Sequence, residues 1–147
     1  MVKNLLMITL LAVGAFMLAQ TIFGQKIVTA AQVNGTWRET SSNPKGITTD
    51  FKIWAQGKGE LAVEFFANNA AKKFSNSAKD TAMIEGAKAM FKPVGNQMNE
   101  NNPCVMTLTF SAAKLIVEES GECGWGAGVS AAGTYKRIST KKPVFDE

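Results

Sequence analysis

The sequence predicts an all-β protein: an antiparallel meander closed into an eight-stranded barrel, with an N-terminal signal helix and one disulfide. Three observations support this. Apolar and polar residues alternate with a period of two, short turn-rich segments separate these runs, and helical periodicity is nearly absent after residue 33. A meander of this length must protect its edge strands, and closure into a barrel does so completely. A β-sandwich is the alternative architecture.

The first residues resemble an export signal. Met1–Asn4 is a short basic segment, and Leu5–Ala19 is an uncharged apolar run. This run is short for a membrane span, so we expect a signal peptide over residues 1–31, cleaved after Ala19, Ala30 or Ala31. A retained anchor is the alternative. Cleavage predicts a periplasmic or secreted protein with no stable membrane insertion afterwards.

The barrel domain is expected over residues 33–140. Phe51, Ile53 and Ala55 alternate with polar neighbours, and Gln56–Gly59 is typical of a tight hairpin. Residues 67–80 break the alternation and are expected to form a loop or one to two helical turns. Residues 93–103 form a polar loop, 120–128 a glycine-rich segment and 141–147 a solvated tail. The expected strands cover 35–40, 51–55, 61–66, 81–85, 87–92, 104–110, 114–119 and 129–138.

The two cysteines, Cys104 and Cys123, predict a disulfide, because an even count in an exported chain usually forms one. They flank the clearest predicted hairpin, 104–119, which brings them nearly opposite each other. The bridge would close a loop of about 20 residues, worth about 3 kcal/mol. Two free thiols or a metal pair are the alternatives.

The two ends of the predicted barrel are alike: Gly35-Thr36-Trp37-Arg38 opens it, and Gly133-Thr134-Tyr135-Lys136-Arg137 closes it. A Gly-x-Trp in the first strand and an Arg near the end of the last resemble the lipocalin and wider calycin signature, at Gly35, Trp37 and Arg137. The resemblance implies that Trp37 packs at the closed end of the barrel with Arg137 across it. A guanidinium over an indole face is favourable and would plug that end.

The C-terminal third is similar to a group of uncharacterised exported bacterial proteins with the pattern C-x-M/I-T-L-x-F…C-G-W/F-G…G-T-Y-K. The matching segments are Cys104–Phe110, Cys123–Gly126 and Gly133–Lys136. This similarity supports an exported barrel and implies no reaction.

The composition argues against an enzyme. The chain has no histidine, which excludes His-based triads and His-ligated metals, so we expect no catalytic residues, no metal and no cofactor. The carboxylates of Glu60, Glu64 and Glu118-Glu119 are interpreted as surface charge. Without residues 1–31 the chain has 14 Lys and Arg residues and 12 Asp and Glu residues, a net charge of +2. Because this charge is small, we expect no nucleic-acid partner.

The sequence therefore predicts a non-enzymatic, lipocalin-like protein that binds a small apolar molecule inside the barrel. The same wall residues would fill the interior if no cavity exists. The alternative is a protein-interaction module with a protein partner, such as a lysozyme-inhibitor-like barrel, because Ser130–Tyr135 loosely resembles the inhibitory loop of such proteins. The predicted wall residues are Phe51, Ile53, Leu61, Val63, Phe65, Met106, Leu108, Phe110, Leu115 and Val117.

Two aromatic features allow two interpretations each. Trp125, in a glycine-rich run, could be a ligand platform at the barrel mouth or could pack over the disulfide. Trp54 and Phe66, on the polar faces of neighbouring strands, could form a protein-contact patch or an ordinary cross-strand aromatic pair.

Overall fold

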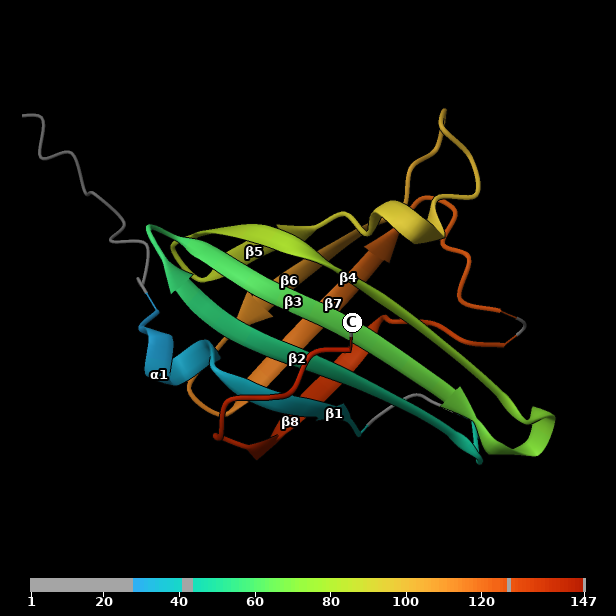
Figure 1. Ribbon diagram of the computed structural model, residues 1–147, viewed down its shortest axis with the longest axis horizontal. Coiled ribbons are helices and arrows are strands. Elements are labelled where there is room, and N and C mark those ends of the chain that lie inside the picture. Colours follow the sequence, from blue (N-terminus) through green and yellow to red (C-terminus); the bar gives the residue numbers. More distant parts are fainter. Residues whose placement is uncertain (1–27, 41–43, 127, 147) are drawn as a thin grey trace, which may run out of the picture.

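The chain folds into a closed, eight-stranded antiparallel β-barrel, as the sequence predicts (Figure 1). The computed structural model describes residues 28–40, 44–126 and 128–146. Each strand pairs with the next along the chain, and β8 returns to pair with β1. The elements are α1 (Ala30–Val33), β1 (Gly35–Glu39), β2 (Ile47–Gly57), β3 (Glu60–Asn69), η1 (Ala70–Lys72), β4 (Phe74–Glu85), β5 (Lys88–Phe91), η2 (Val94–Asn96), β6 (Val105–Phe110), β7 (Lys114–Ser120) and β8 (Gly133–Ser139).

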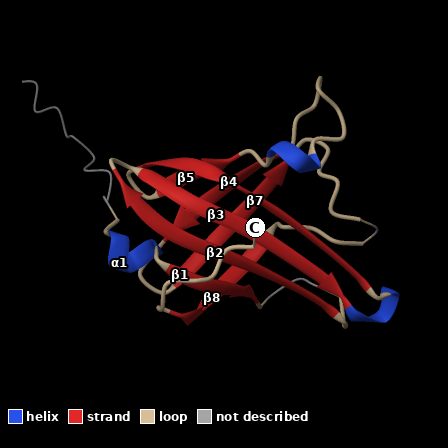
Figure 2. Ribbon diagram, in the orientation of Figure 1, coloured by secondary structure: helices blue, strands red, loops and turns tan. Residues whose placement is uncertain are grey.

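The meander gives the barrel two different ends (Figure 2). One end, called here the closed end, holds α1 and the short turns of the β2–β3, β4–β5 and β6–β7 hairpins. The other end, called here the mouth, holds the described parts of the longer connections: residues 44–46, 70–73, 92–104, 121–126 and 128–132. The long loops at the mouth can therefore adopt structures that the tight turns of the closed end cannot.

The alternation read from the sequence sets which side chains face inward. On β2, Phe51 and Ile53 are fully buried, while the residues that follow each of them, Lys52 and Trp54, are partly exposed. Successive side chains of a strand point to opposite faces, so one face of each strand lines the interior.

The structure corrects two predicted boundaries. Residues 67–80 are mostly strand: β3 continues to Asn69, η1 makes the turn, and β4 begins at Phe74. The interior positions of β4 carry Ala78 and Ala82, which are too small to produce a strong apolar alternation. The last strand begins at Gly133 and not at Val129, because the backbone N–H of Ala131 donates to the Glu119 side chain instead of to a strand neighbour.

The barrel wall is thin beside β4. β4 pairs with β5 only through Met83–Glu85, so the stretch before it has a strand neighbour on one side alone within the described residues. The loop 121–132 lies against this stretch: the Asn76 side-chain amide donates to the Gly124 carbonyl at 2.9 Å, and the Gly126 backbone lies against the Phe74 ring. The short β5 thus leaves a gap that this loop covers.

The predicted disulfide joins Cys104 and Cys123 at the mouth, with a Cα–Cα distance of 4.8 Å. Cys104 precedes β6 and Cys123 follows β7, so the bridge closes the open side of the β6–β7 hairpin. It fixes the start of the 121–132 loop to the barrel wall.

The C-terminal tail is not a freely solvated segment, in contrast to its prediction. Residues 140–146 cross the outer face of β2 and end over β3, as Figure 1 shows. Asp146 contacts Lys52 and Glu64, whose side chains point outward from β2 and β3. The tail is therefore bound to that face by polar contacts of Asp146 with Lys52 and Glu64.

The predicted signal peptide lies largely outside the described residues. Its last predicted residues are part of the barrel: the Val28 N–H donates to the Gly86 carbonyl at 3.2 Å, and the Ala31 carbonyl accepts a bond from Arg137 at 2.6 Å. Among the described residues, no helix has the length and apolar character required to cross a membrane.

Candidate functional site

The predicted wall residues all lie in the barrel interior. Every one of them is at most 3% exposed: Phe51, Ile53, Leu61, Val63, Phe65, Met106, Leu108, Phe110, Leu115 and Val117. They belong to one continuous core together with Phe91 and Tyr135, which the sequence analysis did not include. Phe91 could have been found, because it alternates with Lys92 and Met90 in a predicted strand.

Aromatic rings fill this interior. The Phe51 ring lies 5.0 Å from Phe65, 5.1 Å from Tyr135 and 6.5 Å from Phe91, measured between centroids. Towards the mouth, Phe65 meets Trp125 at 4.6 Å in an edge-on arrangement. Such contacts are typical of a packed core. A molecule that enters the interior must therefore displace a side chain.

At the mouth, the interior ends in a ring that a loop supplies. Trp125 is fully buried although it belongs to a loop and not to a strand. Its indole covers Phe65, which in turn contacts Phe51, so it forms the last layer of the core. One interpretation placed Trp125 at the barrel mouth and the other placed it over the disulfide; the structure places the indole inside the mouth, buried against Phe65.

Glu119 holds the Trp125 loop in place. One carboxylate oxygen at the end of β7 accepts hydrogen bonds from the Trp125 indole N–H at 3.2 Å, the Ala131 backbone N–H at 2.6 Å and the Ser130 hydroxyl at 3.5 Å. A single half-buried carboxylate thus anchors both sides of the loop. No sequence signal marks Glu119, because a carboxylate at the end of a strand normally faces solvent.

Tyr135 joins the same loop to the core. Its hydroxyl donates to the Ala131 carbonyl at 2.7 Å and lies 3.3 Å from the Thr49 hydroxyl. Burial raises the pKa of the Tyr135 hydroxyl well above its ordinary value, and the hydrogen bond with Thr49 offsets only part of this shift. The side chain is fully buried within β8. The Ser130–Tyr135 segment therefore presents no exposed tyrosine to a partner enzyme.

The closed end holds the residues on which the calycin resemblance rests. The Arg137 guanidinium carbon lies 4.9 Å from the Trp37 ring centroid, and the Trp37 indole donates to the Val33 carbonyl at 3.0 Å. Gly35 has a φ of +129°, and a Cβ there would lie 2.0 Å from the Ser139 carbonyl oxygen. The three residues are therefore brought together, as the resemblance implies.

The outer-face aromatics do not form a pair. Trp54 lies opposite Ala62, and Phe66 lies opposite Asp50, four positions from Trp54 along β2. This offset is about 13 Å at the usual rise of a strand. The Lys142 ammonium of the C-terminal tail lies 5.9 Å from the Trp54 ring centroid. The predicted contact patch is thus partly covered by the chain itself.

The carboxylates proposed as surface charge have different surroundings. Glu64 forms an ion pair with Lys52 at 3.0 Å and is 1% exposed, because the tail covers it. Glu119 anchors the mouth loop, as described above. In the described part of the chain, no group of three or more His, Cys, Asp or Glu side chains could hold a metal ion.

Among the surface cavities of the described residues, one lies at each barrel end beside the core. One, of about 280 Å³, opens beside the mouth and is lined by residues such as Ile47, Asn69 and Gly128. The other, of about 200 Å³, lies at the closed end between the segment before α1 and the β2–β3 hairpin, with Leu61 at its base. Comparisons with protein-family models, curated proteins and solved structures found no match.

Proposed function

We propose that this chain is an exported, non-enzymatic binding protein that takes a small apolar or aromatic molecule at the barrel mouth, in place of the Trp125 indole. One observation carries the proposal. The side chain that seals the interior at the mouth belongs to a glycine-rich loop, whereas the other rings of the aromatic core belong to strands.

The chemistry beneath Trp125 fits an apolar ligand. If the loop swings outward, the exposed floor is Phe65 backed by Phe51, with Ala78 opposite Phe65 on β4. An aromatic floor with a few polar groups at its rim is typical of small-molecule sites. The rim would supply the Glu119 carboxylate, which loses its indole donor when Trp125 leaves, so a ligand with one N–H or O–H group would fit best.

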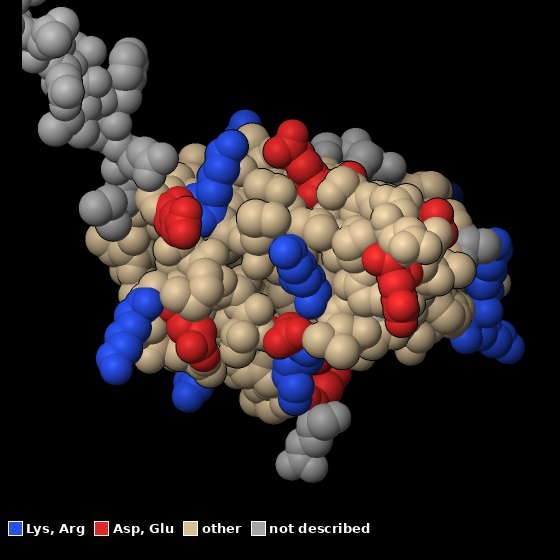
Figure 3. Space-filling view, turned by 90° about the horizontal axis from the view of Figure 1, so that it is seen from above, with Lys and Arg blue, Asp and Glu red and all other residues tan. Residues whose placement is uncertain are grey.

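Export is supported by the disulfide and by the apolar leader segment. The contacts of Val28–Asn34 with the barrel favour cleavage after Ala19 over cleavage after Ala30 or Ala31. On the face shown in Figure 3, basic and acidic side chains are interspersed, which gives nucleic acid no continuous basic surface there.

The test is uptake of two probes, indole and the fluorescent dye N-phenyl-1-naphthylamine, by the wild type and by Trp125→Ala. We expect the wild type to bind both, and Trp125→Ala to bind them about tenfold more tightly because the competing side chain is gone, a gain of about 1.4 kcal/mol.

The matched control is Trp37→Ala, which removes an equally buried indole at the closed end. A cavity alone would take up indole in either variant. Equal uptake by both variants, or no uptake by a folded wild type at saturating probe, would contradict the proposal. Unchanged affinity in Trp54→Ala would show that the dye does not bind on the outer face.

A further inference from the structure

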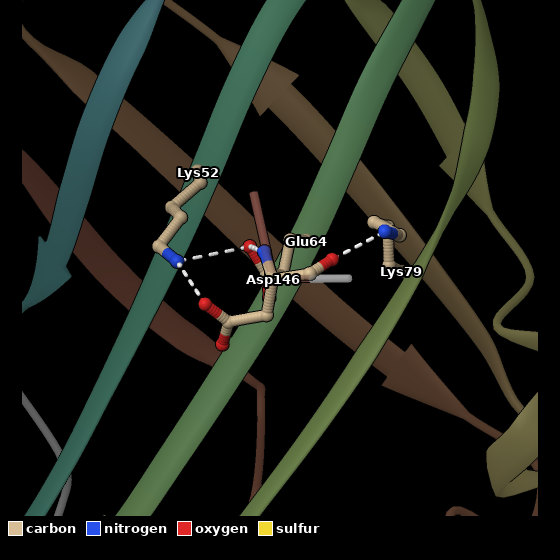
Figure 4. A network of polar contacts seen from close by, with 4 residues as sticks. All are labelled: Lys52, Glu64, Lys79 and Asp146. Atoms are coloured by element: carbon tan, nitrogen blue, oxygen red, sulfur yellow. Dashed lines mark hydrogen bonds and ion pairs between the residues drawn. The ribbon is translucent and has the colours of Figure 1, made fainter. Parts of the chain in front are cut away.

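The C-terminal segment 140–146, called here the strap, lies on an outer face of the barrel that carries specific polar contacts. Figure 4 shows Lys52, Glu64 and Lys79 from three adjacent strands around Asp146 of the strap. In register, Lys52 lies opposite Glu64, and Glu64 lies opposite Lys79. The sheet therefore presents the Glu64 carboxylate with one ammonium group on each side, Lys52 and Lys79.

These three side chains contact every polar group of Asp146. Its backbone N–H donates to the two Glu64 carboxylate oxygens at 3.4 and 3.3 Å. Its side-chain carboxylate lies 3.5 Å from the Lys52 ammonium, and its backbone carbonyl accepts a hydrogen bond from the Lys79 ammonium. Contact with N–H, C=O and carboxylate together selects an acidic residue within an extended segment.

The burial of Glu64 shows that the strap packs closely against β3. Glu64 points outward from β3, yet it is only 1% exposed, because the strap covers it. Partial burial acts to lower the pKa of Lys52, but the hydrogen bond and charge of Glu64, with a smaller contribution from Asp146, outweigh it and raise that pKa. Lys52 therefore stays charged in the covered state.

A second contact fixes the direction of the strap. The Lys142 ammonium lies over the Trp54 ring at 5.9 Å, four residues before Asp146. Cations over an indole face are attracted by the ring quadrupole. The face therefore binds a basic residue over Trp54 and an acidic residue between Lys52 and Lys79.

We propose that this outer face of β2–β4 is a docking site for an extended segment of a partner protein that carries a basic residue followed, four positions later, by an acidic one, and that the strap occupies it in cis. Charge complementarity supports this partner: with the strap removed, two lysines and one glutamate leave a net positive site next to an aromatic ring. A tethered segment acts at an effective concentration in the millimolar range, so the strap regulates access to the site.

The experiment uses the full chain with Asp146→Lys, which places a third ammonium between Lys52 and Lys79 and should release the strap. The probe is a fluorescein-labelled synthetic peptide, Thr-Lys-Lys-Pro-Val-Phe-Asp-amide, copied from residues 140–146. We expect this variant to bind the peptide at least tenfold more tightly than the wild type does, measured by fluorescence anisotropy. Asp146→Asn, which removes only the charge, should give an intermediate affinity.

Two controls test recognition itself. A peptide with Lys in place of its Asp should bind the Asp146→Lys chain at least tenfold more weakly, and adding Lys52→Glu should abolish the difference between the two peptides. Equal binding of both peptides, or no binding by a variant with an intact thermal transition, would overturn the proposal. Wild-type dimers in native mass spectrometry that Asp146→Lys abolishes would identify the occupant as a second copy and would also overturn it.

Discussion

The two ends of the barrel each bury one tryptophan completely, but they support it differently. At the closed end, Trp37 belongs to β1, donates to a backbone carbonyl and lies under Arg137 of the neighbouring strand. At the mouth, Trp125 belongs to a loop and is held by the Glu119 carboxylate. Equal burial thus accompanies different support: Trp37 belongs to a paired strand, whereas Trp125 belongs to a loop that the disulfide and the Glu119 side chain attach to the barrel.

Replacing each tryptophan by alanine gives the largest effects and tests this comparison directly. We expect Trp37→Ala to lower the free energy of unfolding by about 4 kcal/mol, because a rigid strand pair cannot close the cavity. Trp125→Ala should cost about half as much, because the loop that carries it can adjust without breaking strand pairs. Chemical denaturation followed by circular dichroism measures both values. Equal costs would show that the mouth is as rigid as the closed end.

Removing the disulfide should sharpen the contrast between the ends. Replacing Cys104 and Cys123 together by alanine should cost about 3 kcal/mol, the usual value for a loop of this length. Hydrogen exchange should increase mainly in residues 121–132 and not around Trp37, because the bridge tethers the mouth loop. Uniform exchange across both ends would contradict a local role for the bridge.

Two glycines offer a smaller matched test. A Cβ at Gly35 would collide with the Ser139 carbonyl at the β1–β8 seam, whereas a Cβ at Gly128 would meet nothing within 4 Å. Both have positive φ, so Gly128→Ala should cost about 1 kcal/mol for conformation alone, and Gly35→Ala about 2–3 kcal/mol. Thermal melting of the two variants measures the difference. Equal losses of stability would mean that the β1–β8 pair accommodates a Cβ as readily as the mouth loop does.

The smallest effect concerns pH. The pKa of Tyr135 is raised in the folded chain, so its contribution to stability is fully present below the unfolded value of about 10 and is lost as pH rises towards the folded value. Lys52 acts in the same direction. We expect stability to fall above pH 10, and Tyr135→Phe to lessen this fall while costing about 1 kcal/mol at pH 7. Urea denaturation at pH 7 and pH 11 provides the measurement. A variant that loses as much stability as the wild type between these pH values would contradict the assignment to Tyr135.

Local patterns predicted the barrel where side chains alternate strongly. The β2–β3 and β6–β7 hairpins carry large apolar residues at every second position, and both were expected from sequence. The first part of β4, residues 74–80, was not predicted as strand because the inward positions of β4 hold only the small residues Ala78 and Ala82. The sequence of β4 alone does not indicate which distant residues occupy the space beside its alanines.

The candidate sites depend on such long-range contacts even more. The roles of Glu119 and Glu64 arise from the mouth loop and the strap, which approach them only after the barrel has formed. In the sequence, both are ordinary carboxylates on β-strands. Trp125 could be singled out by its glycine neighbours, but its position inside the mouth depends on its contact with Phe65, 60 residues earlier in the sequence.

The meander also has a consequence for how long a folded molecule survives. Seven of the eight strand pairs join consecutive strands, whereas the β1–β8 pair joins the two ends of the barrel and sets Trp37 opposite Arg137, 100 residues later in the sequence. Short-range hairpins can form early, while the seam requires closure of the whole chain. Interactions formed late in folding govern the unfolding rate more than the folding rate. Trp37 and Arg137 should therefore slow unfolding more than they speed folding, and so prolong the survival of the native barrel in the presence of proteases.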